Sequence, residues 1–137
     1  MLKRLFLFIF SFSAIFFTSG CATSNGTNVA QNLPTNKVII YDIKRKGCPA
    51  CEYQERVFRV KEVKELLDKY CKVIYVDVYH QDILPDGLEH TNRTPTAYFV
   101  DSNMHQLIPP VGSVQPYQFR DAILEAVKVL KSRQKNW

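Results

Sequence analysis

Apolar residues gather along residues 37–137 in short runs that predict a domain of the α/β class. Residues 37–43 form a continuous apolar, β-branched run, which is typical of a strand buried on both faces. Residues 71–78 form a second such run and predict a second buried strand. Residues 96–101 predict a third strand, and residues 105–108 a short fourth strand that ends before two prolines.

Two other stretches carry helical periodicity. In residues 51–70, apolar residues recur at spacings of three and four with charged residues between them, and the pattern weakens near residues 59–61. This predicts one helix or two consecutive helices. Residues 116–131 predict a further amphipathic helix, whereas residues 79–93 have little periodicity and predict a loop with one helical turn.

The order of these elements predicts the sheet topology. The first two strands are joined by a helical crossover and should be parallel. The last two are joined by a tight turn and should be antiparallel. We therefore expect a mixed, four-stranded central sheet with helices on both faces.

The N-terminal segment has the pattern of an export signal. Residues 1–20 comprise a short basic start, an apolar run over residues 5–17 and small or polar residues before Cys21. The run is shorter than the roughly 20 residues that span a bilayer, although an uncleaved anchor is the alternative. A small residue followed by Cys resembles a bacterial lipobox, which implies lipidation of Cys21. Thr18 departs from that pattern, where an aliphatic residue is usual; without lipidation Cys21 is an ordinary thiol.

The segment that follows has the composition of a linker. Residues 21–36 contain no charged residue and are rich in Asn, Thr, Ser, Gly and Ala. Such a segment cannot bury a core and predicts a flexible tether. Residues 37–137 are left to form one small domain.

Charge and histidine content limit the function classes. The chain has a net charge of +5, but its basic residues form no stripe with interleaved aromatic residues, so no nucleic-acid partner is expected. Three histidines, His80, His90 and His105, are scattered, and a structural zinc site needs a second ligand pair. Glu52 stands where a c-type haem site requires His. We expect neither metal nor cofactor.

The residues most clearly suited to chemistry are Cys48, Pro49, Ala50 and Cys51, at a predicted strand-to-helix junction. Pro49 suits the first turn of a helix. A thiolate at Cys48 would be stabilised by the unpaired N–H groups and the positive end of the helix dipole. One turn along, Cys51 should be more buried and should act as the resolving thiol. This pattern predicts thiol–disulfide exchange, whereas Cys71 is expected to be a small buried hydrophobe.

These features together resemble the thioredoxin family over nearly all of residues 37–131. The resemblance rests on the CPAC motif after the first strand, on Thr94 and Pro95 before the third strand, and on the order of elements. It implies that Pro95 is a cis-proline facing the CPAC motif, and that Thr94 and Pro95 contact an extended substrate segment. Thr94 is more similar to the residue found in periplasmic disulfide isomerases and reductases than to that of cytosolic thioredoxin.

The resemblance also assigns a role to Asp42, six positions before Cys48. Thioredoxins carry a buried Asp at this offset, which assists deprotonation of the resolving cysteine; the alternative is a solvated acid at a strand end. The chain departs from the family where Gly47 replaces Trp and where the motif dipeptide is Pro-Ala in place of Gly-Pro. These departures leave the direction of electron transfer open, and exported thioredoxin-like proteins are the more similar group.

Taken together, the sequence predicts a thiol–disulfide oxidoreductase of the bacterial cell envelope, with a reductase or isomerase favoured over a primary oxidant. We expect a periplasmic monomer tethered to the inner or outer membrane by a lipid on Cys21. Its partners would be cysteine-containing envelope proteins and a membrane redox partner that supplies electrons. Two alternatives lack exchange activity: a lipid-anchored binding module on the same fold, and a copper chaperone.

Overall fold

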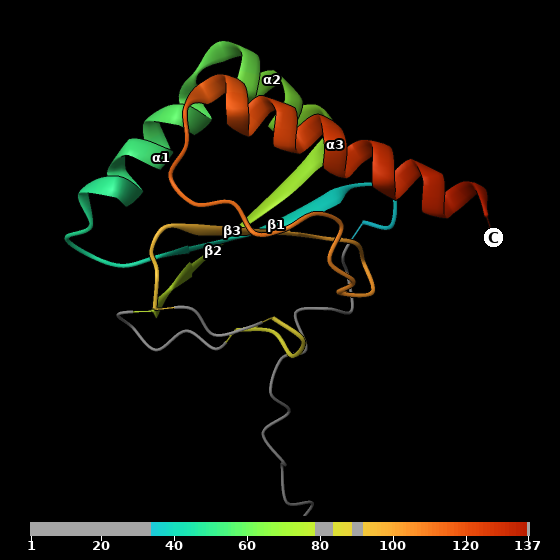
Figure 1. The fold of residues 1–137 in the computed structure, drawn as a ribbon, viewed down its shortest axis with the longest axis horizontal. Helices are drawn as coiled ribbons and strands as arrows, with labels where there is room; N and C mark the ends of the chain where they lie inside the picture. Colours follow the sequence, from blue (N-terminus) through green and yellow to red (C-terminus); the bar gives the residue numbers. More distant parts are fainter. Residues whose placement is uncertain (1–33, 79–83, 89–91, 137) are drawn as a thin grey trace, which may run out of the picture.

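The computed structural model describes residues 34–78, 84–88 and 92–136. Its helices and strands run in the order β1 (Val38–Lys44), α1 (Pro49–Arg59), α2 (Lys61–Tyr70), β2 (Cys71–Asp77), β3 (Thr96–Val100) and α3 (Pro116–Lys135) (Figure 1). The three longest strands and the helices thus occur where the sequence pattern predicts them. The break in the first helical stretch falls at Val60, whose extended backbone separates α1 from α2.

The sheet has the order β2-β1-β3. β1 pairs with β2 in parallel, with Val38 opposite Cys71, and with β3 antiparallel, with Tyr41 opposite Tyr98. The expected parallel pair is therefore confirmed. The fourth strand is not: within the described residues, the segment after β3 adds only two isolated antiparallel bridges, between Val100 and Gln106 and between Ala97 and Val111, so the sheet has three strands.

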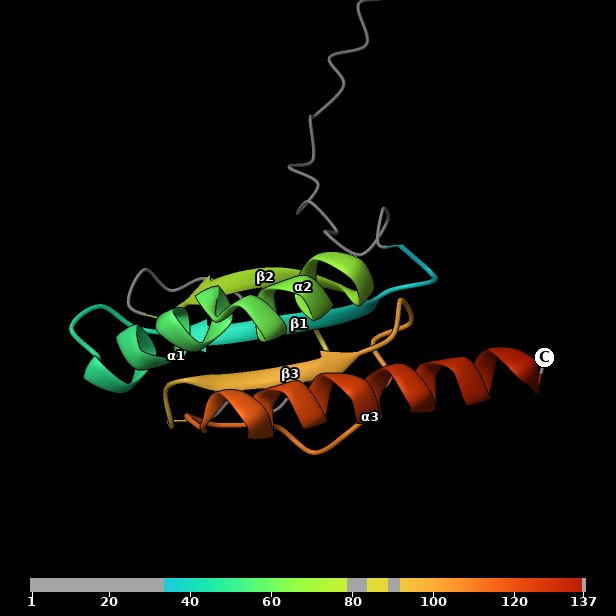
Figure 2. The ribbon, with the colours of Figure 1, turned by 90° about the horizontal axis from the view of Figure 1, so that it is seen from above.

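Within the described residues, helices cover one face of the sheet, whereas the sequence pattern predicted helices on both faces. Figures 1 and 2 show α1, α2 and α3 on the same side of the strands. Alternate residues of β1 and β3 face these helices, including Val38, Ile40 and Phe99. The opposite face packs against Leu84 and Leu88, from the segment between β2 and β3. Part of that segment lies outside the described residues.

Position in the sheet decides how deeply each strand is buried. β1 lies at the centre and is buried along almost its whole length, as its apolar run predicts. The expectation that β2 is also a fully buried strand is wrong. It lies at an edge of the described sheet, and Tyr75 on it is 51% exposed. An apolar run reports the propensity for a strand, but tertiary packing sets its exposure.

The turn between β1 and α1 places the CPAC motif at the end of the central strand. Gly47 has a φ of +70°, a conformation that a residue with a Cβ rarely adopts. This turn leads the chain directly into α1, with Cys48 as the residue that precedes its first turn. The motif thus directly follows the central strand of the described sheet.

Candidate functional site

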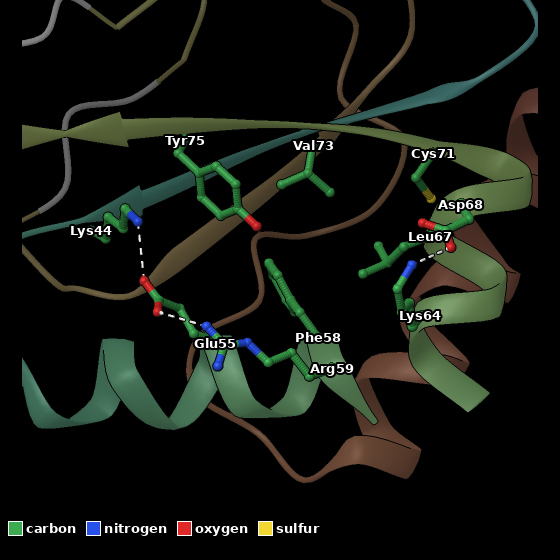
Figure 3. Close-up of a pocket in the computed structure, with 10 residues that line it drawn as sticks. All are labelled: Lys44, Glu55, Phe58, Arg59, Lys64, Leu67, Asp68, Cys71, Val73 and Tyr75. Atoms are coloured by element: carbon green, nitrogen blue, oxygen red, sulfur yellow. Dashed lines mark hydrogen bonds and ion pairs between the residues drawn. The ribbon is translucent and has the colours of Figure 1, made fainter. Parts of the chain in front are cut away.

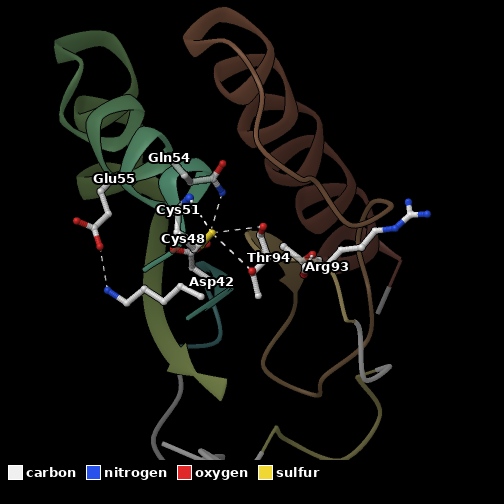
Figure 4. The surroundings of a disulfide bond; sticks show 9 residues. Asp42, Cys48, Cys51, Gln54, Glu55, Arg93 and Thr94 are labelled. Atoms are coloured by element: carbon white, nitrogen blue, oxygen red, sulfur yellow. Dashed lines mark hydrogen bonds and ion pairs between the residues drawn. A yellow bond between two sulfur atoms is a disulfide. The ribbon is translucent and has the colours of Figure 1, made fainter. Parts of the chain in front are cut away.

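Cys48 and Cys51 form a disulfide at the N-terminus of α1 (Figure 4). Cys48 is the N-cap residue, and Pro49 follows at the first helical position, where its missing N–H leaves no hydrogen bond unmade. The backbone N–H of Cys51 donates to Cys48 Sγ at 3.2 Å. The sulfur therefore takes the place of the oxygen that usually caps a helix, and a thiolate there would accept a stronger, charge-assisted bond.

The two cysteines are equally buried, at 5% exposed each, so the expectation that Cys51 is the more buried is wrong. Thr94 covers Cys48 from the loop before β3. Its carbonyl oxygen lies 3.5 Å from Cys48 Sγ, and its hydroxyl donates to the same sulfur at 3.6 Å. This contact joins two residues that are 46 positions apart in the sequence.

Pro95 follows Thr94 through a cis peptide bond, as the resemblance to thioredoxins implies. The chain then enters β3, where Thr96 is buried and its hydroxyl donates to the carbonyl oxygen of Arg93 at 2.7 Å. The end of β1 lies beside the start of the antiparallel strand β3. This arrangement brings Thr94 and Pro95, which precede β3, to the disulfide that follows β1. An extended segment of another protein that reached Cys48 would meet the Thr94 backbone.

Asp42 is buried, with 1% of its surface exposed, and shares the helix-covered face of β1 with Val38 and Ile40. Its Oδ1 accepts a hydrogen bond from Gln54 Nε2 at 3.4 Å. Gln54 lies on α1 one turn beyond Cys51, hence on the same side of the helix. Asp42 therefore lies against the face of α1 that carries Cys51, and the alternative of a solvated acid is wrong.

Burial raises the pKa of Asp42 from its ordinary 3.8 to about 6. The hydrogen bond from Gln54 and the nearby charge of Lys44 oppose this rise, whereas Glu55 adds to it. A carboxyl group with a pKa near neutrality can both accept and release a proton in the physiological range. The pKa of Asp42 is thus suited to proton transfer near neutral pH.

The positive charge before the motif is partly neutralised. Lys44 Nζ pairs with Glu55 Oε1 at 3.1 Å, whereas Arg45 and Lys46 line a pocket of about 230 Å³ beside the disulfide. Glu52 also lines this pocket. The local field at the cysteines therefore comes from both signs of charge, and the helix N-terminus is the consistent positive contribution.

A larger cavity, of about 680 Å³, lies between the helices α1 and α2 and the edge strand β2 (Figure 3). Cys71 lines it but is 6% exposed, and burial raises the pKa of its thiol to about 12. At neutral pH it is a protonated thiol, which is neither nucleophile nor metal ligand. The prediction that Cys71 is a small buried hydrophobe is confirmed.

Within the described part of the chain, no three side chains of His, Cys, Asp or Glu gather in an arrangement that could hold a metal ion. No helix in the same residues is long and apolar enough to cross a membrane. Cys21, together with the predicted signal and tether, lies outside the described residues, as do His80 and His90.

Comparison with solved structures agrees with this architecture. An oxidoreductase named DsbH superposes with a TM-score of 0.51 at 16% identity, over 68% of this chain and 74% of that one. The chain has a thioredoxin-like fold. A disulphide isomerase from Xylella fastidiosa Temecula1 aligns with a TM-score of 0.45 at 15% identity, over 73% of this chain and 80% of that one. No protein-family profile and no curated protein sequence matches the chain.

The buried acid of this thioredoxin-like domain should make its stability depend on pH. The folded pKa of Asp42 lies above the unfolded value, so its protonated form stabilises the fold at low pH, and this stability is lost as the pH rises from about 4 through 6. The shift corresponds to about 3 kcal/mol. We expect Asp42→Asn to raise the free energy of unfolding by about that amount at pH 8.

The same comparison at pH 4 should show a much smaller difference, because Asp42 is then protonated in the folded state and partly protonated in the unfolded state, whose pKa is near 3.8. Urea unfolding of the oxidised protein and the variant at the two pH values measures this directly. An equal difference at both values would mean that the carboxyl group does not titrate as its burial indicates.

Proposed function

We propose that the chain is a thiol–disulfide oxidoreductase of the bacterial cell envelope, acting through Cys48 and Cys51. The observation that carries the proposal is the placement of this disulfide at the N-terminus of α1, against Thr94 and beside the buried Asp42. Each neighbour has a use in exchange. The helix end stabilises a thiolate, the Thr94 backbone offers pairing to a substrate, and Asp42 offers a base.

As a reductase, the protein would begin with both cysteines reduced. The Cys48 thiolate attacks one sulfur of a substrate disulfide, that S–S bond breaks, and the second substrate sulfur leaves as a thiolate that takes up a proton. Cys51 then loses its proton to Asp42 and attacks Cys48 Sγ. The mixed disulfide breaks, and the substrate leaves with both thiols reduced. The substrate gains two electrons, and the cysteine pair loses them.

For the envelope location we rely on the sequence. Residues 1–20 carry the pattern of an export signal, and lipidation of Cys21 would tether the domain through residues 21–36. In this setting the substrates would be cysteine-containing envelope proteins. A membrane redox partner would have to return electrons to the pair, because the bacterial periplasm is kept oxidising.

A redox titration tests this function and its direction. We would equilibrate the full chain with a Cys71→Ser substitution against reduced and oxidised glutathione and measure the fraction with a Cys48–Cys51 disulfide. A potential below roughly −230 mV is expected and fits a reductase, whereas about −120 to −180 mV would indicate an oxidant or isomerase. If no ratio of reduced to oxidised glutathione interconverted the two thiols and the disulfide, the exchange hypothesis would be wrong. The hypothesis of a binding module or a copper chaperone would then replace it.

A further inference from the structure

Gln54 is a polar residue where the packing of α1 calls for an apolar one. It is 0% exposed and shares the buried side of α1 with Cys51, Val57 and Phe58. Placing an amide in such an interior costs free energy unless its polar atoms are hydrogen-bonded. The residue therefore requires an explanation beyond packing.

Only half of the Gln54 amide is satisfied. Nε2 donates to Asp42 Oδ1 at 3.4 Å, and Figure 4 draws both residues among the surroundings of the disulfide. Among the residues that the structure describes, Oε1 is buried and has no hydrogen-bond partner. An ionised carboxylate can only accept hydrogen bonds, so it requires the Nε2 side of an amide; a protonated carboxyl group has a donor, which suits Oε1. Rotation of the Gln54 amide by half a turn would bring Oε1 to the position opposite Asp42 that Nε2 now occupies.

We propose that Gln54 is a positioning residue that holds Asp42 in both protonation states and thereby sets the pH at which Asp42 takes the proton of Cys51. The inference rests on the proposed exchange function, whose second step it concerns. When Cys51 gives up its proton, the Asp42 carboxylate becomes a carboxylic acid. The Gln54 amide then turns, and its Oε1 accepts the new O–H. When Asp42 releases the proton to solvent, the amide returns.

The other charged and titratable groups around Asp42 do not supply this function. Lys44 on β1 lowers the pKa of Asp42 and Glu55 on α1 raises it, but these two side chains pair with each other at 3.1 Å. Tyr75 on β2 is uncharged at neutral pH, and its own pKa is raised, chiefly by burial and then by Asp42. Gln54 makes the direct hydrogen bond, and it follows burial in the size of its effect on the pKa of Asp42.

The direction of the Gln54 effect follows from hydrogen-bond strength. A bond to an ionised carboxylate is about twice as strong as a bond between neutral groups. Although the amide serves both states, it therefore favours the carboxylate and keeps the pKa of Asp42 lower than burial alone would set it. Without the amide, Asp42 should remain protonated to higher pH, so it should be available as the base for Cys51 only at higher pH.

The test is the pH dependence of disulfide closure in the full chain. The reduced protein is mixed with saturating oxidised glutathione, so that release of glutathione from the Cys48 mixed disulfide by Cys51 limits the rate. Gln54→Met keeps much of the side-chain volume and removes both hydrogen-bonding atoms. We expect this variant to move the midpoint of the acid limb upward by about one pH unit, since a charged hydrogen bond is lost.

The matched control is the same substitution in an Asp42→Asn background, where Gln54→Met should not move the pH profile at all. A purely structural role for Gln54 would change the rate by the same factor in both backgrounds. If Asp42→Asn moves the profile and Gln54→Met does not, the inference is wrong. If Asp42→Asn itself has no effect, the inference is also wrong, but exchange by Cys48 and Cys51 stands. If the unsubstituted chain never closes its disulfide, the proposed function fails.

A second measurement needs no substitution at Gln54 and so does not depend on that variant folding. The side-chain amide signals of Gln54, followed by NMR between pH 4 and 8, should titrate with the midpoint of Asp42, at about 6. They should cease to titrate in Asp42→Asn. Signals that stay constant across this range in the unsubstituted protein would overturn the proposal.

Discussion

Replacing Cys48 with serine is expected to reduce thiol–disulfide exchange to the uncatalysed background. A serine hydroxyl at the start of α1 is not ionised at neutral pH and cannot form a disulfide, so no mixed disulfide with a substrate can arise. The loss should be complete, because neither thiol that remains in the described residues can replace Cys48. Cys51 is 5% exposed and has lost its partner, and Cys71 is buried with its pKa raised to about 12. The measurement is the rate at which the full chain, with dithiothreitol as reductant, reduces a disulfide-bonded peptide.

Two other cysteine variants are the controls for this loss. Cys51→Ser should also stop turnover, but it should retain the peptide on Cys48 as a mixed disulfide that mass spectrometry detects, because the resolving thiol is missing. Cys71→Ser should exchange at the unsubstituted rate. Undiminished exchange in Cys48→Ser would exclude the mechanism proposed above. A peptide that bound equally well to the oxidised protein and to Cys48→Ser, without exchange in either, would indicate a binding module.

Local sequence was sufficient to single out the cysteine pair that the structure joins, and the catalytic roles of the two residues stay a prediction. Cys48 and Cys51 have a spacing that, after a strand and before a helix, indicates exchange by itself. Pro95 and Asp42 were predicted from the resemblance to thioredoxins. The structure places Asp42 in the interior and Pro95 in a cis peptide next to the residue that covers Cys48. Lipidation of Cys21 stays a prediction.

Gln54 was not predicted as a functional residue, because glutamine as a residue type seldom indicates a role in catalysis. A signal was nevertheless present in the spacing. Gln54 lies three residues after Cys51 and three before Val57, which places it on the side of the helix that an amphipathic pattern assigns to the core. A polar residue in an apolar stripe predicts a buried hydrogen-bond partner. That partner, Asp42, lies on another element, and sequence order alone does not bring the two together.

The limits of the sheet could not be predicted because they depend on packing between distant segments. The run of residues 105–108 looks like a strand, yet Met104 before it has a φ of 65°, and Pro109 and Pro110 after it have no N–H to donate. A single bridge at Gln106 remains. Likewise, the apolar run of β2 cannot reveal that one of its edges has no neighbouring strand in the described sheet. Local pattern specifies strands, and topology decides which become edges.

The same packing makes Phe119 a residue whose loss should cost much stability. Its side chain is 0% exposed and joins three elements. Its ring lies 4.9 Å from that of Phe58 on α1 and 5.7 Å from that of Phe99 on β3, measured between centroids. We expect Phe119→Ala to lower the free energy of unfolding by about 3–5 kcal/mol, through the lost burial and the cavity left between the helices and the sheet. Denaturant unfolding of the oxidised full chain measures this change.

Tyr117 provides a matched control on the same helix, because it is also aromatic but is 57% exposed. Tyr117→Ala should change the free energy of unfolding by about 0.5 kcal/mol or less. Both substitutions place alanine in the same helix. The difference between their changes in the free energy of unfolding therefore measures the packing of Phe119 in the interior and not a change in the helix propensity of α3. Since small domains are stable by only about 5–15 kcal/mol, Phe119→Ala should bring the protein close to unfolding. Equal effects of the two substitutions would mean that α3 does not pack on the sheet through Phe119.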